Sequence, residues 1–434
     1  MKDELYKTMH HFFPSFSNWL DLVSEPRQKE KIEYPKDYLI WVGILLFLMK
    51  LETRRQIKFQ FNTEEFIGNI NLLAETEIKQ MAHPDTLGYL LKRLYPEDLS
   101  DVRVKMVSRL IRMRNLEKFR LLGEYYLITV DGTGHLVFNR RHCEHCLVKE
   151  KDGKVLYYYH NVLEAKLVTA NGLALSIETE FIENPSKEFD KQDCELRAFY
   201  RLVEKLNKHF PQLKICLLLD ALYAAKPVFE RCRKYGWKYL ITFKKGSMPA
   251  VYEEYIALKS LQRENEAQFK DGKCIQNYNW VNSIEYEEYS LDAIECNESK
   301  PGKGGKIEDT KFVWATNFKV NQCNFKQIAK AGRLRWKTEN EGFNTQKNGG
   351  YNLEHAYSHD EMAGKNFYLL LQIAHTINQL MEKGTLLKDQ IQKVFGSIRN
   401  IARRLLEDFR TKSTTKEQLQ SLLSVPFQIR FDSS

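Results

Sequence analysis

The chain has 434 residues, of which 43% are hydrophobic and 12% aromatic. This supports a large core in two or three domains and excludes disorder as the default expectation. The net charge of +9 makes a polyanionic partner plausible. The longest apolar run, from Tyr38 to Met49, is shorter than the roughly 20 residues that a membrane-spanning helix needs, so we expect a buried helix and no membrane partner.

The first residues, MKDELYKTMHHFF, contain early acids and lack the long apolar stretch of a secretory signal. The eight cysteines are spread through the chain, which fits reduced thiols better than a disulfide framework. We therefore expect a cytoplasmic protein.

Apolar residues recur at helical spacing through residues 1–120, which predicts an N-terminal helical domain. Its most basic segment, residues 101–120, carries seven Lys or Arg side chains and two acids. One face of this helix could lie along a DNA phosphate backbone, or it could be the ordinary solvated face of an amphipathic helix.

The pattern changes at Tyr125, where a short β-rich run ends in Asp131. Two longer strand-like runs follow, joined by Asn171-Gly172, which is a strong hairpin signal. A helix, a strand ending in Asp220, a second helix and a further strand come next. This order predicts an α/β core in which a β-meander precedes an α-β-α-β unit.

Residues 247–325 are polar and strand-like, which predicts a β-rich insertion. The insertion would divide the catalytic core into residues 121–246 and residues 326–384. Helical periodicity dominates the rest of the chain, so residues 385–434 are expected to form a helical C-terminal region.

The stretch RLRWKTENEGFNTQK places Glu339 and Glu341 among cations on an expected helix. Each acid taken alone has a plain structural explanation. Asp131 begins an Asp-Gly turn, Asp220 could cap a helix, and a glutamate on a cationic helix usually pairs with its neighbours. Acids at these three topological positions together indicate one site.

The segments VDGTG, LLLDALYA and GRLRWKTENEGFNTQKNGGYNLEH resemble the three acid-bearing motifs of the cut-and-paste DDE transposases of bacterial insertion sequences. The resemblance covers about residues 121 to 375 and implies an RNase-H-like catalytic core. It implies that Asp131, Asp220 and Glu339 are the catalytic acids, and that Thr133 matches a hydroxyl residue often found two positions after the first acid.

The third motif resembles the tyrosine-arginine-glutamate-lysine signature of these transposases, with Arg335 one helical turn before Glu339. It departs from that signature at two positions, because Gly332 stands in place of the tyrosine and Gln346 in place of the lysine, with Lys347 beside it. Glu341 therefore stays a second candidate for the third acid, although the RW-x-x-E spacing favours Glu339.

Carboxylate oxygens are suitable ligands for Mg²⁺ or Mn²⁺, and two such ions about 4 Å apart can drive phosphoryl transfer. The acids would then hold two ions, while Arg335, Lys337 and Lys347 contact DNA phosphates. The resemblance also implies an aromatic side chain in the insertion that stacks on an unpaired base. Trp280 is the candidate, with a core position as the alternative.

The expected function is therefore metal-dependent cleavage at transposon ends and strand transfer into target DNA. The implied partners are double-stranded DNA, both the terminal inverted repeats and the target, and a second copy of the chain in an active homodimer. The implied location is the bacterial nucleoid. Two alternatives are a metal-dependent nuclease without strand transfer and a DNA-binding protein without catalysis.

Cys143 and Cys146 form a Cys-x-x-Cys pair, which is half of a tetrahedral zinc site. His160 or a neighbouring histidine would complete a Zn²⁺ site, with a redox or purely structural role as the alternatives. His355 and His359 are four residues apart, which on a helix is either a metal-like spacing or ordinary surface polarity.

Overall fold

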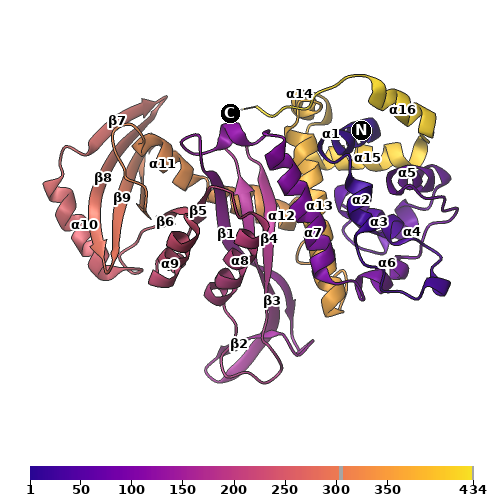
Figure 1. Cartoon of the computed structure of the whole chain (residues 1–434), viewed down its shortest axis with the longest axis horizontal. Coiled ribbons are helices and arrows are strands. Elements are labelled where there is room, and N and C mark those ends of the chain that lie inside the picture. The colour runs from indigo at the N-terminus through magenta and orange to yellow at the C-terminus, as the bar shows by residue number, and fades with distance from the viewer. Residues whose placement is uncertain (303–305, 433–434) are drawn as a thin grey trace.

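The computed structural model describes residues 1–302 and 306–432 of the chain. A mixed sheet runs through the middle of the molecule, with a helical lobe beside one end and the predicted insertion at the other (Figure 1). The α/β class predicted from the order of the strand and helix signals is confirmed.

The first half of the sheet is antiparallel and includes a three-stranded meander. It contains β1 (Tyr126–Phe138), β2 (Leu147–Lys151), β3 (Lys154–Val168) and β4 (Ala174–Ile182). The long β3 pairs antiparallel with each of the other three strands. The predicted turn at Asn171-Gly172 lies between β3 and β4, as its residue types require.

Two crossovers continue the sheet from β1. Helix α8 (Glu195–His209) leads to β5 (Ile215–Leu219), and α9 (Lys226–Tyr235) leads to β6 (Lys238–Thr242). Strand β5 runs parallel to both β1 and β6. The predicted meander followed by α-β-α-β is therefore confirmed, and β1 lies between an antiparallel and a parallel neighbour.

Side chains alternate between the two faces of β1. Ile128 and Val130 pack with buried residues of α8 and α9, whereas Leu127 packs with Ile328 of α11 (Phe325–Arg333). Both faces of this part of the sheet are therefore covered by helices.

The insertion continues the same sheet instead of forming a separate one. It contains β7 (Glu266–Asp271), β8 (Cys274–Tyr286), β9 (Tyr289–Pro301) and β10 (Ile307–Thr316). Strand β10 pairs antiparallel with β6, so the strand order runs β3-β1-β5-β6-β10-β9-β8-β7. Ten strands thus share one hydrogen-bonded network.

The insertion begins with a helix that the sequence did not indicate, α10 (Pro249–Leu261). The expectation of a strand-like region from residue 247 is wrong here. Tyr255 is fully buried and Val251 nearly so, and both belong to the core on the α8 side of the sheet. No other residue of α10 is buried, so its helical periodicity is weak in the sequence.

The helical lobe is built around α3, whose residues from Tyr38 to Leu48 are all buried. This confirms the buried helix predicted for the longest apolar run. Across residues 1–302 and 306–432, no helix combines the length and apolar composition of a membrane span. The N-terminal helices are α1 (Lys2–Phe12), α2 (Phe16–Asp21), α3 (Lys36–Leu48), α4 (Gln56–Gln60), α5 (Glu64–Ala74), α6 (Pro84–Leu91) and α7 (Pro96–Arg112), with 3₁₀ turns η1 (Lys29–Lys31) and η2 (Glu117–Phe119).

The end of the chain folds back onto this lobe (Figure 1). The Met1 amino group lies 3.0 Å from Asp408 Oδ2, and the rings of Phe12 and Phe431 stack at 5.6 Å. Residues 385–432 therefore share one core with residues 1–120. The elements after α11 are η5 (Thr338–Asn344), α12 (Thr345–Asn348), α13 (Glu361–Lys383), α14 (Lys388–Gln390), η6 (Ile391–Phe395), α15 (Ile398–Thr411) and α16 (Lys416–Ser424).

One cation of the basic segment 101–120 is part of the core. Arg103 of α7 is fully buried, and its guanidinium donates to Glu178 Oε1 at 2.9 Å and to Ser176 Oγ at 3.1 Å. Because a buried guanidinium needs such partners, this side chain fastens α7 to β4. Arg103 is therefore excluded from any contact with a phosphate backbone.

Candidate active site

Two of the predicted acids belong to neighbouring parallel strands: Asp131 lies within β1, where it continues the strand instead of starting a turn, and Asp220 directly follows β5. Thr129 of β1 is paired with Leu218 of β5, and the same register continued by two residues brings Asp131 beside Asp220. Asp220 follows β5 directly and caps the short 3₁₀ turn η3 (Ala221–Tyr223), where its Oδ1 accepts a hydrogen bond from the Leu222 N–H at 2.8 Å. The carboxyl ends of parallel strands are a common place for a ligand site.

The third acid is brought to this place by η5, which is a π-helix. The buried hydroxyl groups of Thr129 and Thr338 are hydrogen-bonded to each other, and this bond ties β1 to the first residue of η5. Thr129 lies two residues before Asp131 on the same face of β1. Glu339 therefore follows a residue that is anchored next to Asp131. Short π-helical turns are frequent at functional sites.

The charges around Asp131 confirm that these groups are neighbours. Burial raises the pKa of Asp131 to about 6, the positive charge of Arg335 opposes this rise, and the charges of Glu195, Asp220 and Glu339 add to it. The Arg335 guanidinium lies 3.7 Å from Asp131 Oδ2. The structure thus brings together Asp131, Asp220, Glu339 and Arg335, which the sequence analysis had grouped.

A fourth carboxylate, Glu195, was not predicted. It is the first residue of α8, and its Oε1 accepts a hydrogen bond from the Tyr223 hydroxyl at 2.7 Å. Its Oε2 lies against the backbone of β1, so close that a Cβ atom added to Gly132 would be only 2.8 Å from it. Burial raises the pKa of Glu195; the bond from Tyr223 lowers it and the charge of Asp220 raises it. An acid in the first helical turn is so common that the sequence alone gives no signal.

The acids do not converge on a single point. Within the described parts of the chain, only Cys143, Cys146 and His160 bring three potential ligand atoms within 4.8 Å of one another. Like charges in a partly buried site repel one another. A pair of divalent ions about 4 Å apart does not require all its carboxylates to meet at one point.

Glu339 is better placed than Glu341 to act with the two aspartates. Glu341 Oε1 accepts a hydrogen bond from Lys337 Nζ at 3.3 Å. The same oxygen lies 3.6 Å from the Cβ position of Gly172, in the turn between β3 and β4. Glu341 and Lys337 therefore form a pair directed toward this turn, whereas the charge of Glu339 acts on Asp131.

The departures from the transposase signature have structural reasons. A Cβ atom on Gly332 would lie 2.6 Å from the Trp314 ring, so no larger residue fits there without movement of that ring. Gln346 is fully buried and donates to Gln372 Oε1 at 2.8 Å. Lys347 lies nearer the surface, where its Nζ is 2.9 Å from Glu354 Oε1.

The tryptophan predicted to stack on a base is in the core. Trp280 is 2% exposed and its ring stacks on Phe325, with centroids 5.0 Å apart. The predicted contact of Trp280 with an unpaired base therefore has no support, and the alternative core position is the observed one. The exposed tryptophan beside the acids is Trp336, which is 53% exposed and has the Arg335 guanidinium over its ring at 4.9 Å.

Thr133 lies on β1, two residues beyond Asp131, and its side chain is buried. It shares the face of Asp131 because side chains alternate along a strand. The two histidines with metal-like spacing, His355 and His359, lie outside the helices, in the connection between α12 and α13. The helical face that their spacing implied is therefore not formed.

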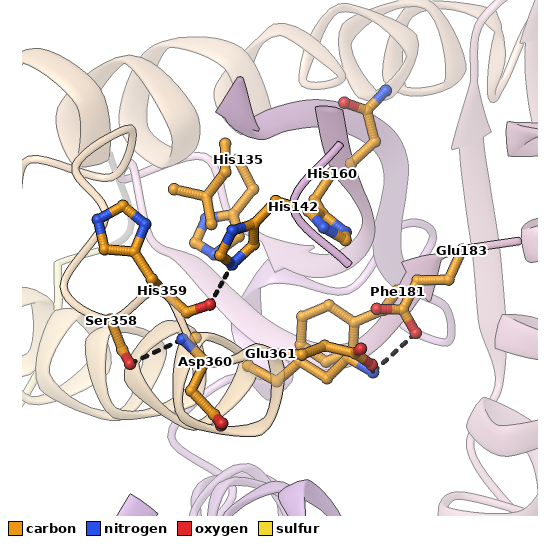
Figure 2. A pocket seen from close by; sticks show the side chains of 13 residues that line it. His135, His142, His160, Phe181, Glu183, Ser358, His359, Asp360 and Glu361 are labelled. Carbon is orange, nitrogen blue, oxygen red and sulfur yellow. Dashed lines mark hydrogen bonds and ion pairs between the residues drawn. The ribbon is translucent and has the colours of Figure 1, made fainter. Parts of the chain in front are cut away.

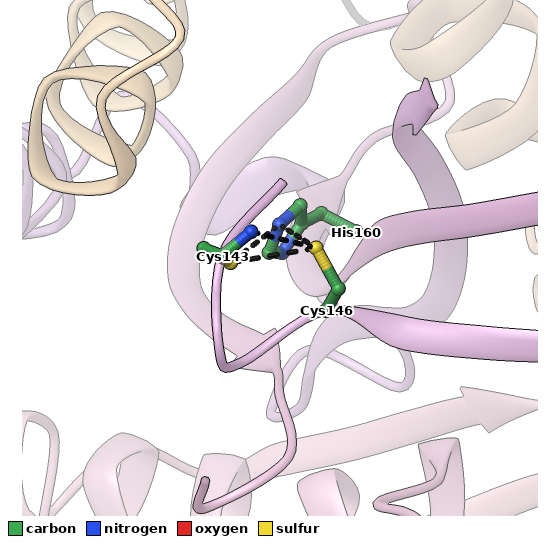
Figure 3. Close-up of side chains that lie close together, drawn as sticks. All are labelled: Cys143, Cys146 and His160. Atoms are coloured by element: carbon green, nitrogen blue, oxygen red, sulfur yellow. Dashed lines mark hydrogen bonds between the residues drawn. The ribbon is translucent and has the colours of Figure 1, made fainter. Parts of the chain in front are cut away.

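The predicted Cys-x-x-Cys pair meets His160 at the far end of β1. Cys143 and Cys146 lie in the connection between β1 and β2, and His160 lies on β3 (Figure 3). The two sulfur atoms are 3.4 Å apart, and His160 Nε2 lies 3.3 Å from Cys143 Sγ and 3.4 Å from Cys146 Sγ. Burial lowers the pKa of His160 to about 4, so its imidazole is neutral at pH 7.

A pocket adjoins this cluster at the start of α13 (Figure 2). His135, His142 and His160 line one part of it, and Glu183 and Glu361 line another. Lys365 Nζ donates to Glu183 Oε2 at 2.7 Å and to Glu361 Oε1 at 2.8 Å. The pocket therefore contains polar groups that are already paired with one another.

Comparison with protein-family models finds no match for the chain, and comparison with curated proteins finds none either. The geometry of the four acids and of the cysteine-histidine cluster is therefore the basis for interpreting this α/β protein.

Proposed function

We propose that this chain is a DDE transposase of a bacterial insertion sequence, which cleaves DNA at the transposon ends and joins them to target DNA. The observation that carries the proposal is that the charges of Asp220 and Glu339, which lie far away in the sequence, act on Asp131 beside Arg335. The strand order β4-β3-β1-β5-β6 supports the proposal, because a three-stranded meander followed by two parallel strands agrees with an RNase-H-like core.

The residues at this site fit a divalent cation. Their donors are carboxylate oxygens, which suit Mg²⁺ or Mn²⁺. Burial raises the pKa of Asp131 and its acidic neighbours add to this rise, although the charge of Arg335 opposes it, so a further positive charge would stabilise the ionised carboxylates. Asp131, Asp220 and Glu339 would hold the ions, and Glu195 would add a fourth carboxylate. When bound, two such ions activate the attacking oxygen and stabilise the leaving one.

The basic and aromatic residues around the acids support a role in holding DNA. Arg335 lies next to Asp131, and its planar guanidinium can bind a phosphate through two hydrogen bonds. Trp336 adjoins it and presents an exposed ring on which a base can stack. Lys337 and Lys347 already have carboxylate partners, so DNA phosphates would have to compete for these two lysines.

The proposed substrates are the terminal inverted repeats of the element and a target duplex. The active assembly would be a homodimer that brings two ends together, located in the nucleoid of a bacterial cytoplasm. The net charge of +9 favours association with DNA at low salt.

The proposal is tested with duplex DNA taken from the regions that flank this reading frame, incubated with the protein and Mg²⁺. Asp131→Ala, Asp220→Ala and Glu339→Ala should each lower the rate of end cleavage by about a thousandfold or more, because each removes a carboxylate from the metal site. Gel-shift binding of the same DNA should change by less than about threefold, because the carboxylates do not attract phosphates.

Glu341→Ala is the matched control. It removes an acid from the same π-helix, but this acid pairs with Lys337. It should retain most of the activity. Full cleavage by any of the three alanine variants would remove that residue from the site. Cleavage without integration into a plasmid target would instead identify a metal-dependent nuclease.

A further inference from the structure

The cysteine-histidine cluster at the end of β1 has the dimensions of a zinc site. Tetrahedral Zn²⁺ with bonds of about 2.3 Å to sulfur and 2.0 Å to nitrogen separates two sulfurs by about 3.8 Å and a sulfur from a nitrogen by about 3.5 Å. The observed separations are 3.4 Å between the sulfurs and 3.3 and 3.4 Å from sulfur to nitrogen. The sulfurs are too far apart for a disulfide, whose bond is about 2.05 Å.

The backbone around the two cysteines is held in place by hydrogen bonds. The Cys143 N–H donates to Cys146 Sγ at 3.4 Å, and the Asn184 side chain donates to the Cys146 carbonyl at 2.9 Å. The Asn184 N–H also donates to the His145 carbonyl at 3.1 Å. Such outer contacts orient metal ligands and are a regular part of metal sites.

The two histidines next to these cysteines, His142 and His145, each have one ring nitrogen engaged elsewhere. His142 Nε2 contacts the His359 carbonyl, and His145 Nδ1 contacts the Asn184 carbonyl at 2.8 Å. Among the residues that the structure describes, no fourth histidine, cysteine or carboxylate joins the group of three within 4.8 Å. Three protein ligands are therefore available, and one position of a tetrahedron is left for water.

We propose that Cys143, Cys146 and His160 bind one Zn²⁺ ion, with water as the fourth ligand. Two thiolates and an imidazole select Zn²⁺ over the Mg²⁺ that suits carboxylate oxygens. The ion fastens the connection between β1 and β2 onto β3, and in this way holds the end of the strand that carries Asp131.

This site is separate from the four acids. His160 is opposite Leu136 of β1, whereas Glu164 is opposite Asp131. His160 and Glu164 are four residues apart on β3, which corresponds to about 13 Å along the strand. The zinc proposal therefore stands or falls independently of the proposed transposase function.

Zinc content is measured by mass spectrometry of the purified full-length protein, prepared without chelators. We expect about one Zn²⁺ per chain, and less than about one tenth of that in the double variant Cys143→Ser/Cys146→Ser. The double variant Cys194→Ser/Cys323→Ser is the matched control, because both of these cysteines are exposed, and it should keep its zinc. A chelator should lower the melting temperature of the wild type and of this control only.

Cobalt substitution of the wild-type protein gives a test that does not depend on the folding of any variant. Co²⁺ should produce the sulfur-to-cobalt charge-transfer band and the intense visible bands of a tetrahedral site. Glu361 supplies a carboxylate of the adjoining pocket. Glu361→Gln should leave the cobalt spectrum unchanged, and a changed spectrum would overturn the assignment of the fourth ligand as water. A wild-type protein that takes up neither Zn²⁺ nor Co²⁺, or that contains a Cys143–Cys146 disulfide, would overturn the site itself.

Discussion

Gly132 of β1 and Glu195 of α8 are in close contact at the candidate active site. Gly132 directly follows Asp131 on β1, and its missing side chain leaves room for Glu195 Oε2. The other oxygen of Glu195 is held by the Tyr223 hydroxyl. The position of this carboxylate therefore depends on a residue that has no side chain of its own.

Gly132→Ala should lower the rate of DNA end cleavage by about tenfold or more, because the added Cβ would lie 2.8 Å from Glu195 Oε2 and displace it. The free energy of unfolding should change by less than about 1 kcal/mol, since the displaced atom ends a flexible side chain. Glu195→Gln should lower cleavage similarly, and the double variant should add little to either effect.

Gly134→Ala provides the control for this experiment. It lies on the same strand, and its added Cβ would meet only Asn161 Oδ1, at an ordinary contact distance of 3.8 Å. Equal activities of the Gly132→Ala and Gly134→Ala proteins would exclude a role for Glu195 in cleavage. Activities would be compared with the melting temperatures of the same preparations.

The sequence predicted some site residues and missed others for physical reasons. Asp131 and Asp220 were predictable because each follows an apolar, strand-like run in the sequence, and strand order then places them together, although β1 continues past Asp131. Glu195 was not, because its role depends on the close approach of α8 to Gly132. Trp280 was assigned to DNA because burial of a strand residue depends on what packs over it, here Phe325.

At the scale of elements, the π-helix η5 rests on a buried lysine of β3. Lys166 is fully buried, and its Cε lies 3.0 Å from the Cβ position of Gly342 in η5. Its Nζ donates to Gln372 Oε1 of α13 at 3.2 Å and lies 5.3 Å from the Phe343 ring centroid. Burial lowers the pKa of Lys166 to about 8, while the charge of Glu164 raises it and that of Arg103 lowers it.

This buried amine predicts a pH dependence of stability. Between the folded pKa of about 8 and the ordinary value of 10.5, the unfolded chain binds more protons at Lys166 than the folded one. The contribution of Lys166 to the free energy of unfolding should therefore rise with pH by about 1.4 kcal/mol per pH unit in this window. This gain in stability should be lost again as the pH falls through 8. Lys166→Met should lack this rise.

The measurement is denaturant unfolding of the wild type and of Lys166→Met at several values between pH 7 and pH 10. The difference between the two free energies should shift in favour of the wild type as the pH increases. A constant difference would show that the Lys166 amine keeps its proton in the folded protein throughout this range.

The sheet shows where prediction from sequence reaches its limit at this scale. The strands of the insertion were predicted, because alternation and turn residues mark them. Their attachment to the core depends on pairs such as Trp314 with Thr242, which join β10 to β6 across a large sequence separation. The π-helical form of η5 could not be predicted either, because its residues suit an ordinary helix.

At the scale of the whole molecule, the helical lobe is assembled from both ends of the chain. Phe409 of α15 is fully buried between Phe66 of α5 and Tyr6 of α1, with ring centroids 5.3 and 6.3 Å away. Asn69 of α5 donates to the Phe409 carbonyl at 3.1 Å. The sequence divided these residues into separate N- and C-terminal regions because no local pattern reports contacts over such a distance.

Phe409→Ala should lower the free energy of unfolding by about 3 to 5 kcal/mol, because it leaves a cavity in the shared core. Hydrogen exchange of the backbone amides in α1 and α5 should become faster, although the change lies in α15. Val425→Ala, at an exposed position, is the control and should alter neither. Unchanged exchange in α1 and α5 would mean that the two regions are stabilised separately.

The ion pair between Met1 and Asp408 joins residues 407 positions apart and has a consequence for biosynthesis. The central strands can pair while the chain is still emerging from the ribosome, whereas α1 must wait for α15 and Phe431 before its apolar face is covered. During that interval the nascent chain exposes this face to chaperones and to other chains. Slow translation of the codons for residues 385–432 should therefore increase aggregation more than slow translation of the insertion.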